Sequence, residues 1–97
     1  MQDKMQRIYE QIAELGKKYG VQKIILFGSR ARGDNYDKSD IDLAIYGCEE
    51  FAALQEEVEE NVWTLLKFDM IDMNVCTRAE ELVREIERDG IVLYEKV

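Results

Sequence analysis

The chain has 97 residues, of which 46% are hydrophobic and 35% charged, and this is typical of a single folded domain, expected here over residues 1–97. No apolar run approaches the roughly 20 residues that a membrane-spanning helix needs, and no signal peptide is evident after Met1, so we expect a cytoplasmic protein with no membrane contact. The net charge of −8 disfavours stable binding to duplex nucleic acid, and the absence of histidine argues against a zinc site.

The first half of the chain predicts a helix and two strands. Apolar residues at steps of three and four predict an amphipathic helix over residues 5–19, which Gly20 ends. Residues 21–27 are rich in Ile and Val and predict a buried strand. A turn follows at residues 28–33, with room for one turn of helix. Alternation of apolar and polar residues over residues 40–46 then predicts the second strand.

The second half predicts a helix, a strand, a short helix and a strand. Helical spacing of apolar residues predicts a helix over residues 51–65, and residues 70–75 predict the third strand. A capping box at residues 77–80 begins the short helix, and residues 91–94 predict the last strand. The order of these elements indicates an α/β fold, in which helices pack on a small sheet.

The turn at residues 28–33 has the features of a phosphate-binding site. Gly28 can adopt the positive φ that lets backbone N–H groups converge on an anion, and Ser29 adds a hydroxyl donor. Arg30 and Arg32 can bind phosphate oxygens in bidentate fashion, with ion pairs to nearby aspartates as the alternative. We therefore expect these four residues to bind a nucleotide.

Asp40 and Asp42 lie two residues apart in the predicted second strand, so their side chains project from one face. Two carboxylates this close repel each other unless a cation lies between them, which favours a metal site over a merely charged strand edge. A third carboxylate is expected from residues 70–75, where Asp72 interrupts an apolar strand. Asp69, at the edge of that strand, is the alternative to Asp72.

Asp40, Asp42 and Asp72 would together hold two divalent cations, Mg²⁺ or Mn²⁺, because oxygen ligands suit these metals. Two such ions about 3.5–4 Å apart can orient a nucleoside triphosphate and activate an attacking hydroxyl. The sequence therefore predicts an enzyme in which these three aspartates are catalytic.

The central segment resembles the signature of the minimal nucleotidyltransferases, which belong to the DNA polymerase beta-like superfamily. The residues that carry the likeness are Gly28-Ser29, Ala31-Arg32-Gly33 and Ser39-Asp40-Ile41-Asp42-Leu43, and residues 89–94 also end the chain as these domains do. The resemblance implies a mixed sheet with flanking helices, Mg²⁺, and ATP as the nucleotide donor. It assigns phosphate binding to Gly28 and Ser29, and the metal triad to the three aspartates.

Short chains of this family often pair with a small helical HEPN-domain protein encoded nearby, as antitoxin to toxin. The resemblance implies that the enzyme adenylylates this toxin, commonly on a tyrosine, within a hetero-oligomer. The length agrees, because few residues remain to build an acceptor pocket. Two alternatives stay open: transfer to a small-molecule alcohol held by a companion subunit, and a non-catalytic antitoxin that blocks its partner sterically.

Overall fold

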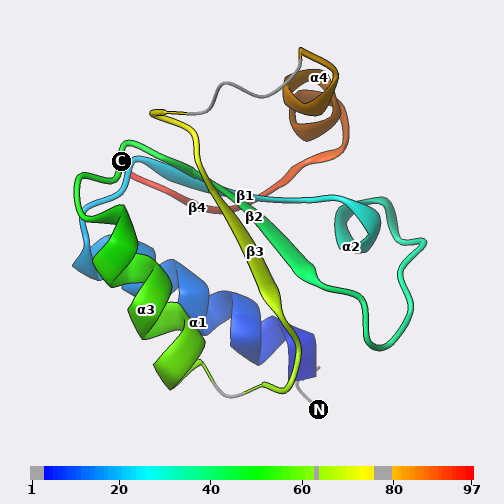
Figure 1. Cartoon of the computed structure of the whole chain (residues 1–97), viewed down its shortest axis with the longest axis horizontal. Coiled ribbons are helices and arrows are strands. Elements are labelled where there is room, and N and C mark those ends of the chain that lie inside the picture. Colours follow the sequence, from blue (N-terminus) through cyan, green and yellow to red (C-terminus); the bar gives the residue numbers. More distant parts are fainter. Residues whose placement is uncertain (1–3, 63, 76–79) are drawn as a thin grey trace.

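The computed structural model describes residues 4–62, 64–75 and 80–97. In chain order the elements are α1 (Lys4–Lys18), β1 (Lys23–Phe27), α2 (Ser29–Arg32), β2 (Ile41–Tyr46), α3 (Phe51–Asn61), β3 (Phe68–Asp72), α4 (Glu80–Asp89) and β4 (Ile91–Glu95) (Figure 1). This confirms the predicted order, and the turn after β1 contains the single helical turn α2. None of the described helices combines the length and apolar character that crossing a bilayer requires.

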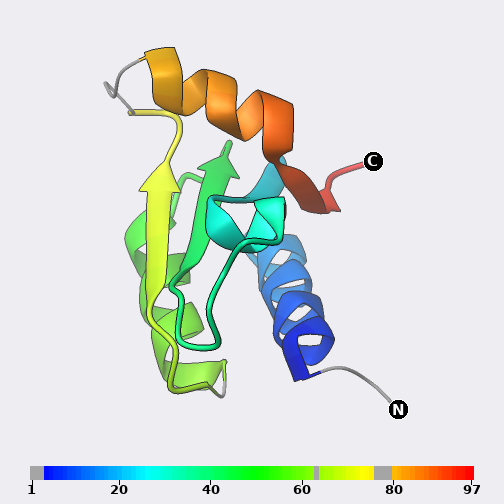
Figure 2. The same cartoon turned by 90° about the vertical axis from the view of Figure 1, so that its right-hand side faces the viewer.

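In the described residues, four strands form one mixed sheet in the order β3-β2-β1-β4. β1 is antiparallel to both β2 and β4, whereas β2 and β3 are parallel. Figure 2, in which α2 faces the viewer, shows β2 and β3 running side by side in the same direction. The starts of β2 and β3 therefore meet the end of β1 at one end of the sheet, which brings three distant chain segments together.

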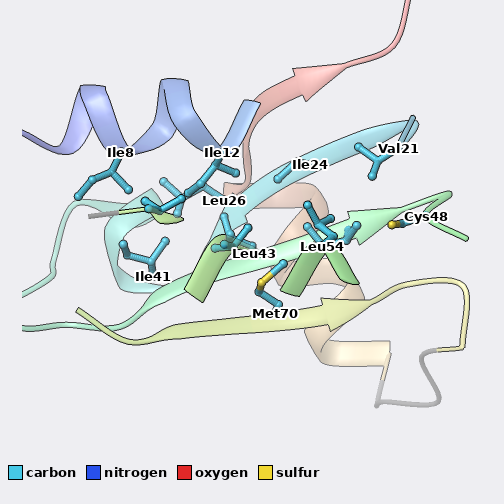
Figure 3. Close-up of a cluster of buried hydrophobic side chains, with 13 residues drawn as sticks. Ile8, Ile12, Val21, Ile24, Leu26, Ile41, Leu43, Cys48, Leu54 and Met70 are labelled. Atoms are coloured by element: carbon cyan, nitrogen blue, oxygen red, sulfur yellow. The ribbon is translucent and has the colours of Figure 1, made fainter. Parts of the chain in front are cut away.

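The helices cover both faces of this sheet: α1 and α3 lie on one face and α4 on the other (Figure 1). The main core lies under α1 and α3, where Figure 3 shows Ile12, Leu43 and Leu54 packed together. A smaller core lies under α4 and consists of Ile25, Phe27, Ala44, Ile71 and Ile86. Because side chains alternate along a strand, these two clusters identify the face to which each strand residue points.

The bounds of α3 and β3 differ most from the predictions. The helix α3 ends at Asn61 instead of residue 65, because Val62 has extended backbone angles, and Thr64 Oγ1 accepts the N–H of Leu66 in the turn that leads to β3. β3 runs from Phe68 to Asp72, which is two to three residues earlier than predicted. Its start is set by pairing with β2, which composition alone does not reveal. The predicted capping box begins outside the described residues.

Candidate functional site

Gly28 directly follows β1 and begins the turn that carries the predicted phosphate site. Its φ of 75° and ψ of −156° lie in a region that essentially only glycine occupies. The carbonyl oxygens of Gly28 and Ser29 accept the hydrogen bonds that close α2. The N–H groups of Ser29 and Arg30 come at the start of this turn, before any intrahelical acceptor is available to them. The turn is therefore suited to donate hydrogen bonds to an anion.

Asp42 lies next to this turn, in the row of the sheet between Phe27 of β1 and Asp69 of β3. The approach is close: a Cβ atom added to Gly28 would overlap Oδ2 of Asp42. Glycine at this position therefore serves two purposes, since it permits the backbone angles of the turn and leaves space for the carboxylate. The predicted phosphate-binding turn and the predicted metal-binding carboxylate are direct neighbours.

Negative charge is concentrated around Asp42. Burial, followed by the carboxylates of Asp69 and Asp40, raises the pKa of Asp42 to about 6. Glu85 in α4 adds to this increase, and the Arg32 guanidinium opposes it. Carboxylates crowded in this way are unfavourable unless a cation neutralises them. The candidate metal ligands are all carboxylate oxygens, which Mg²⁺ and Mn²⁺ prefer, so the residues present fit a divalent cation.

Asp40 lies one residue before β2 and is exposed. The next residue, Ile41, donates its N–H to the carbonyl of Lys67, so Asp40 is the last residue outside the β-ladder. Across the three described ranges, no three Cys, His, Asp or Glu side chains are already grouped closely enough to hold a metal ion. A cation would have to draw the exposed carboxylates of Asp40 and Asp69 toward the half-buried Asp42.

Asp72 does not join this cluster, which corrects the expectation from the sequence. It pairs with Ile45, three positions beyond the Asp42–Asp69 pair, and alternation places its side chain on the opposite face of the sheet from Asp69. Its Oδ1 accepts the N–H of Asn74 at 3.0 Å, in the turn that follows β3. This hydrogen bond accounts for a carboxylate in an apolar strand, and Asp69, the alternative, is the residue that lies beside Asp42.

Both arginines of the turn have partners within the chain. Arg30 donates from Nε to the carbonyl of Ser39 and from Nη2 to the carbonyl of Asp37, each at 3.1 Å. Arg32 forms ion pairs with the aspartate two residues on and with Glu85. The sequence left phosphate binding and ion pairing open for these side chains. In this structure Arg32 links the turn to α4, and Arg30 holds the loop that leads to Asp40.

A hollow of about 750 Å³ opens at the same end of the sheet. Its apolar lining includes Met5 and Ile8 of α1 and Leu65 and Leu66 before β3, and it meets the turn at Arg30. The aspartates of the candidate site are not among its lining residues. The carboxylates therefore lie outside this hollow, beside the turn.

The chain matches the family model described as Polymerase beta, Nucleotidyltransferase over residues 10–97. A candidate protein adenylyltransferase of Methanocaldococcus jannaschii is 36% identical over 98 residues, which cover 90% of this chain and 94% of that protein. The family match, over residues 10–97, includes the turn and the aspartates described above.

Solved structures share the fold. A toxin–antitoxin crystal structure with AMP-PNP has a TM-score of 0.70 and 22% identity, covering 91% of this chain and 73% of the other. A mutant of the MntA-HpeT toxin–antitoxin has a TM-score of 0.69 and 20% identity, with the same coverage. The structure of a candidate minimal nucleotidyltransferase has a TM-score of 0.69 and 24% identity, covering 90% of each chain.

Three findings agree: the glycine turn in contact with a carboxylate, the mixed sheet, and a family match over nearly the whole chain. The resemblance read from the sequence is thereby confirmed. The chain belongs to the polymerase beta family of nucleotidyltransferases.

Proposed function

We propose that this nucleotidyltransferase is a protein adenylyltransferase, which moves AMP from ATP to a hydroxyl group of a partner protein. The partner would be a HEPN-type toxin modified on a tyrosine, and the chain would act as its antitoxin in the cytoplasm. The observation that carries the proposal is the contact between the Gly28 turn and Asp42, with Asp69 in the next strand. The name of the relative from Methanocaldococcus jannaschii supports the same reaction.

In this proposal Asp40, Asp42 and Asp69 hold divalent cations, Mg²⁺ or Mn²⁺. When bound, these ions supply positive charge that offsets the phosphates and lowers the pKa of the acceptor hydroxyl. The N–H groups at the start of α2 and the hydroxyl of Ser29 bind the phosphate oxygens of the leaving pyrophosphate. The acceptor oxygen attacks the α-phosphorus of ATP, the bond to the bridging oxygen of the β-phosphate breaks, and the hydroxyl proton passes to solvent.

The arrangement of the site favours a protein as the acceptor. The aspartates do not line the large hollow, so the described residues leave the acceptor side of the site to another molecule. A partner protein can supply both the hydroxyl and the missing walls. The structures with similar folds include toxin–antitoxin complexes, which supports a toxin as that partner.

The proposal is tested by incubating the chain with ATP labelled at the α-phosphate, Mg²⁺ and the protein encoded by the neighbouring gene. We expect label on the partner and, after proteolysis, on a tyrosine of that partner. Label on an added small alcohol instead would support the small-molecule alternative. If a chain carrying both Asp40→Ala and Asp42→Ala still neutralises the partner fully, the antitoxin acts sterically and the catalytic proposal is wrong.

The third carboxylate is tested by a matched pair of variants. Asp69→Asn removes a proposed metal ligand without changing size, and we expect transfer to fall by about 100-fold or more, as for loss of a principal electrostatic contact. Asp72→Asn makes the same chemical change three residues away on the other face, and its amide oxygen can still accept from Asn74. Transfer by this control should stay within about threefold of wild type. If Asp72→Asn loses more transfer activity than Asp69→Asn does, then Asp72 and not Asp69 is the third metal ligand.

A further inference from the structure

We propose that Arg30 is a positioning residue, whose guanidinium fixes the chain in front of Asp40 and so sets the place of this carboxylate relative to the Gly28 turn. The inference rests on the proposed function for the role of Asp40 in binding a cation. It replaces the expectation from the sequence that Arg30 binds phosphate.

The need for such a residue follows from the position of Asp40. Asp42 is held by pairing with strands on both sides, whereas Asp40 lies outside the ladder, at the end of the loop over residues 33–39. This loop leaves the turn and returns to the start of β2 without regular structure. The sheet holds Asp40 only through its neighbour Ile41, so the position of this carboxylate also depends on how the loop before it is held.

The loop is organised by a small set of hydrogen bonds. Tyr36 donates its N–H to Oγ of Ser39 at 2.8 Å, and Ser39 donates its N–H to the carbonyl of Tyr36 at 3.1 Å. These two bonds close residues 36–39 on themselves, whereas the start of the loop is bonded to α2, where Asp34 donates its N–H to the carbonyl of Ser29 and pairs with Arg32. Arg30 attaches the end of the loop, because it binds the carbonyls of Asp37 and Ser39, and Ser39 directly precedes Asp40.

Arginine is suited to this task because its planar guanidinium presents several N–H donors in a fixed geometry. The bond from Nε is partly buried, and the two acceptors are carbonyl oxygens two residues apart. A lysine ammonium is a single charged point on a flexible stem and cannot hold both carbonyls in the same way. Since Arg30 follows Ser29 directly, the side chain connects the phosphate-binding turn to the carboxylate on the other side of the site.

The test compares Arg30→Lys and Arg30→Ala with a control, Lys38→Ala, which removes a positive charge from the same loop. Mn²⁺ binding and ATP binding at saturating Mn²⁺ are measured by calorimetry, and amide hydrogen exchange is followed in the free protein. If Arg30 positions Asp40, both Arg30 variants bind Mn²⁺ about tenfold or more weakly, in the range seen for residues that orient metal ligands. Their affinity for ATP changes less than about twofold, and exchange at residues 36–40 accelerates while the amides of β1 and β2 keep their protection.

Two results would overturn the inference. One result is that Arg30→Lys binds both Mn²⁺ and ATP as wild type does, while Arg30→Ala loses ATP affinity. Residue 30 would then act through its positive charge on the phosphates of ATP, and not by positioning Asp40. If exchange at residues 36–40 is the same in wild type and Arg30→Ala, the guanidinium does not hold the loop. These measurements need no acceptor protein, so a failure to label any partner would count against the proposed function and leave the result for Arg30 standing.

Discussion

Replacing Asp42 by asparagine is expected to abolish transfer and yet make the metal-free protein more stable. Burial and the carboxylates of Asp69 and Asp40 raise the pKa of Asp42 from 3.8 to about 6, so the charged form is disfavoured in the folded protein. At 1.36 kcal/mol for each pKa unit, this corresponds to about 3 kcal/mol. The side chain is only half-buried and water screens much of the effect, so we expect a gain of about 1 kcal/mol.

The pH dependence follows from proton linkage. The folded protein keeps a proton on Asp42 to a higher pH than the unfolded chain does. The penalty is therefore absent below about pH 4, grows between about pH 4 and 6, and is complete above that range. The advantage of Asp42→Asn should be largest at about pH 7.5 and should shrink toward pH 4.

Urea denaturation in the presence of a chelator, followed by circular dichroism at both pH values, measures this difference. Glu59→Gln, an exposed change on α3, serves as the control and should leave the free energy of unfolding within about 0.5 kcal/mol of wild type. Adding Mg²⁺ at about pH 7.5 should make wild type more stable than Asp42→Asn, because wild type binds the ion more tightly. If Asp42→Asn is less stable than wild type at the higher pH, or if the difference does not change with pH, the proposed crowding of carboxylates is refuted.

Three further substitutions test the turn and its link to α4. Gly28→Ala should lower the free energy of unfolding by at least about 2 kcal/mol and abolish transfer, because alanine is strained at this φ and ψ and its Cβ would overlap Asp42. Gly33→Ala, at a positive φ with no atom within 4 Å of the added Cβ, should cost less stability in the same urea titration and retain transfer. Glu85→Gln breaks the ion pair with Arg32, which is partly exposed, so it should cost less than about 1 kcal/mol, with the difference from wild type decreasing as salt is added.

The pair Asp40 and Asp42 could be placed from the sequence because their relation is local. Asp42 lies in β2 and Asp40 one residue before it, so the sequence predicts that the two carboxylates are close, while the loop that Arg30 holds sets the direction of Asp40. The same holds for the turn, since Gly28 was expected to have a positive φ and does. The order of helices and strands also follows from local apolar spacing, and the structure confirms it.

The third carboxylate could not be chosen in this way. Asp69 and Asp72 lie on opposite faces of the sheet and three residues apart along β3. Which of them lies beside Asp42 depends on where β3 begins and how it pairs with β2. The apolar residues around them are compatible with a strand from either start. β2 and β3, which α3 connects along the chain, pair in parallel, and the register of this pairing determines which aspartate lies beside Asp42. No local pattern encodes that register.

Local patterns predict the fold class, the glycine turn and the close pair Asp40 and Asp42, because each depends on neighbours within a few residues. Long-range packing places Asp69 beside Asp42 and selects the partners of the two arginines. Their partners, including the carbonyl of Ser39 and the carboxylate of Glu85, come from segments that only folding brings to the turn. A long, flexible arginine side chain can reach many acceptors, and its choice among them is made by the packing of the whole domain.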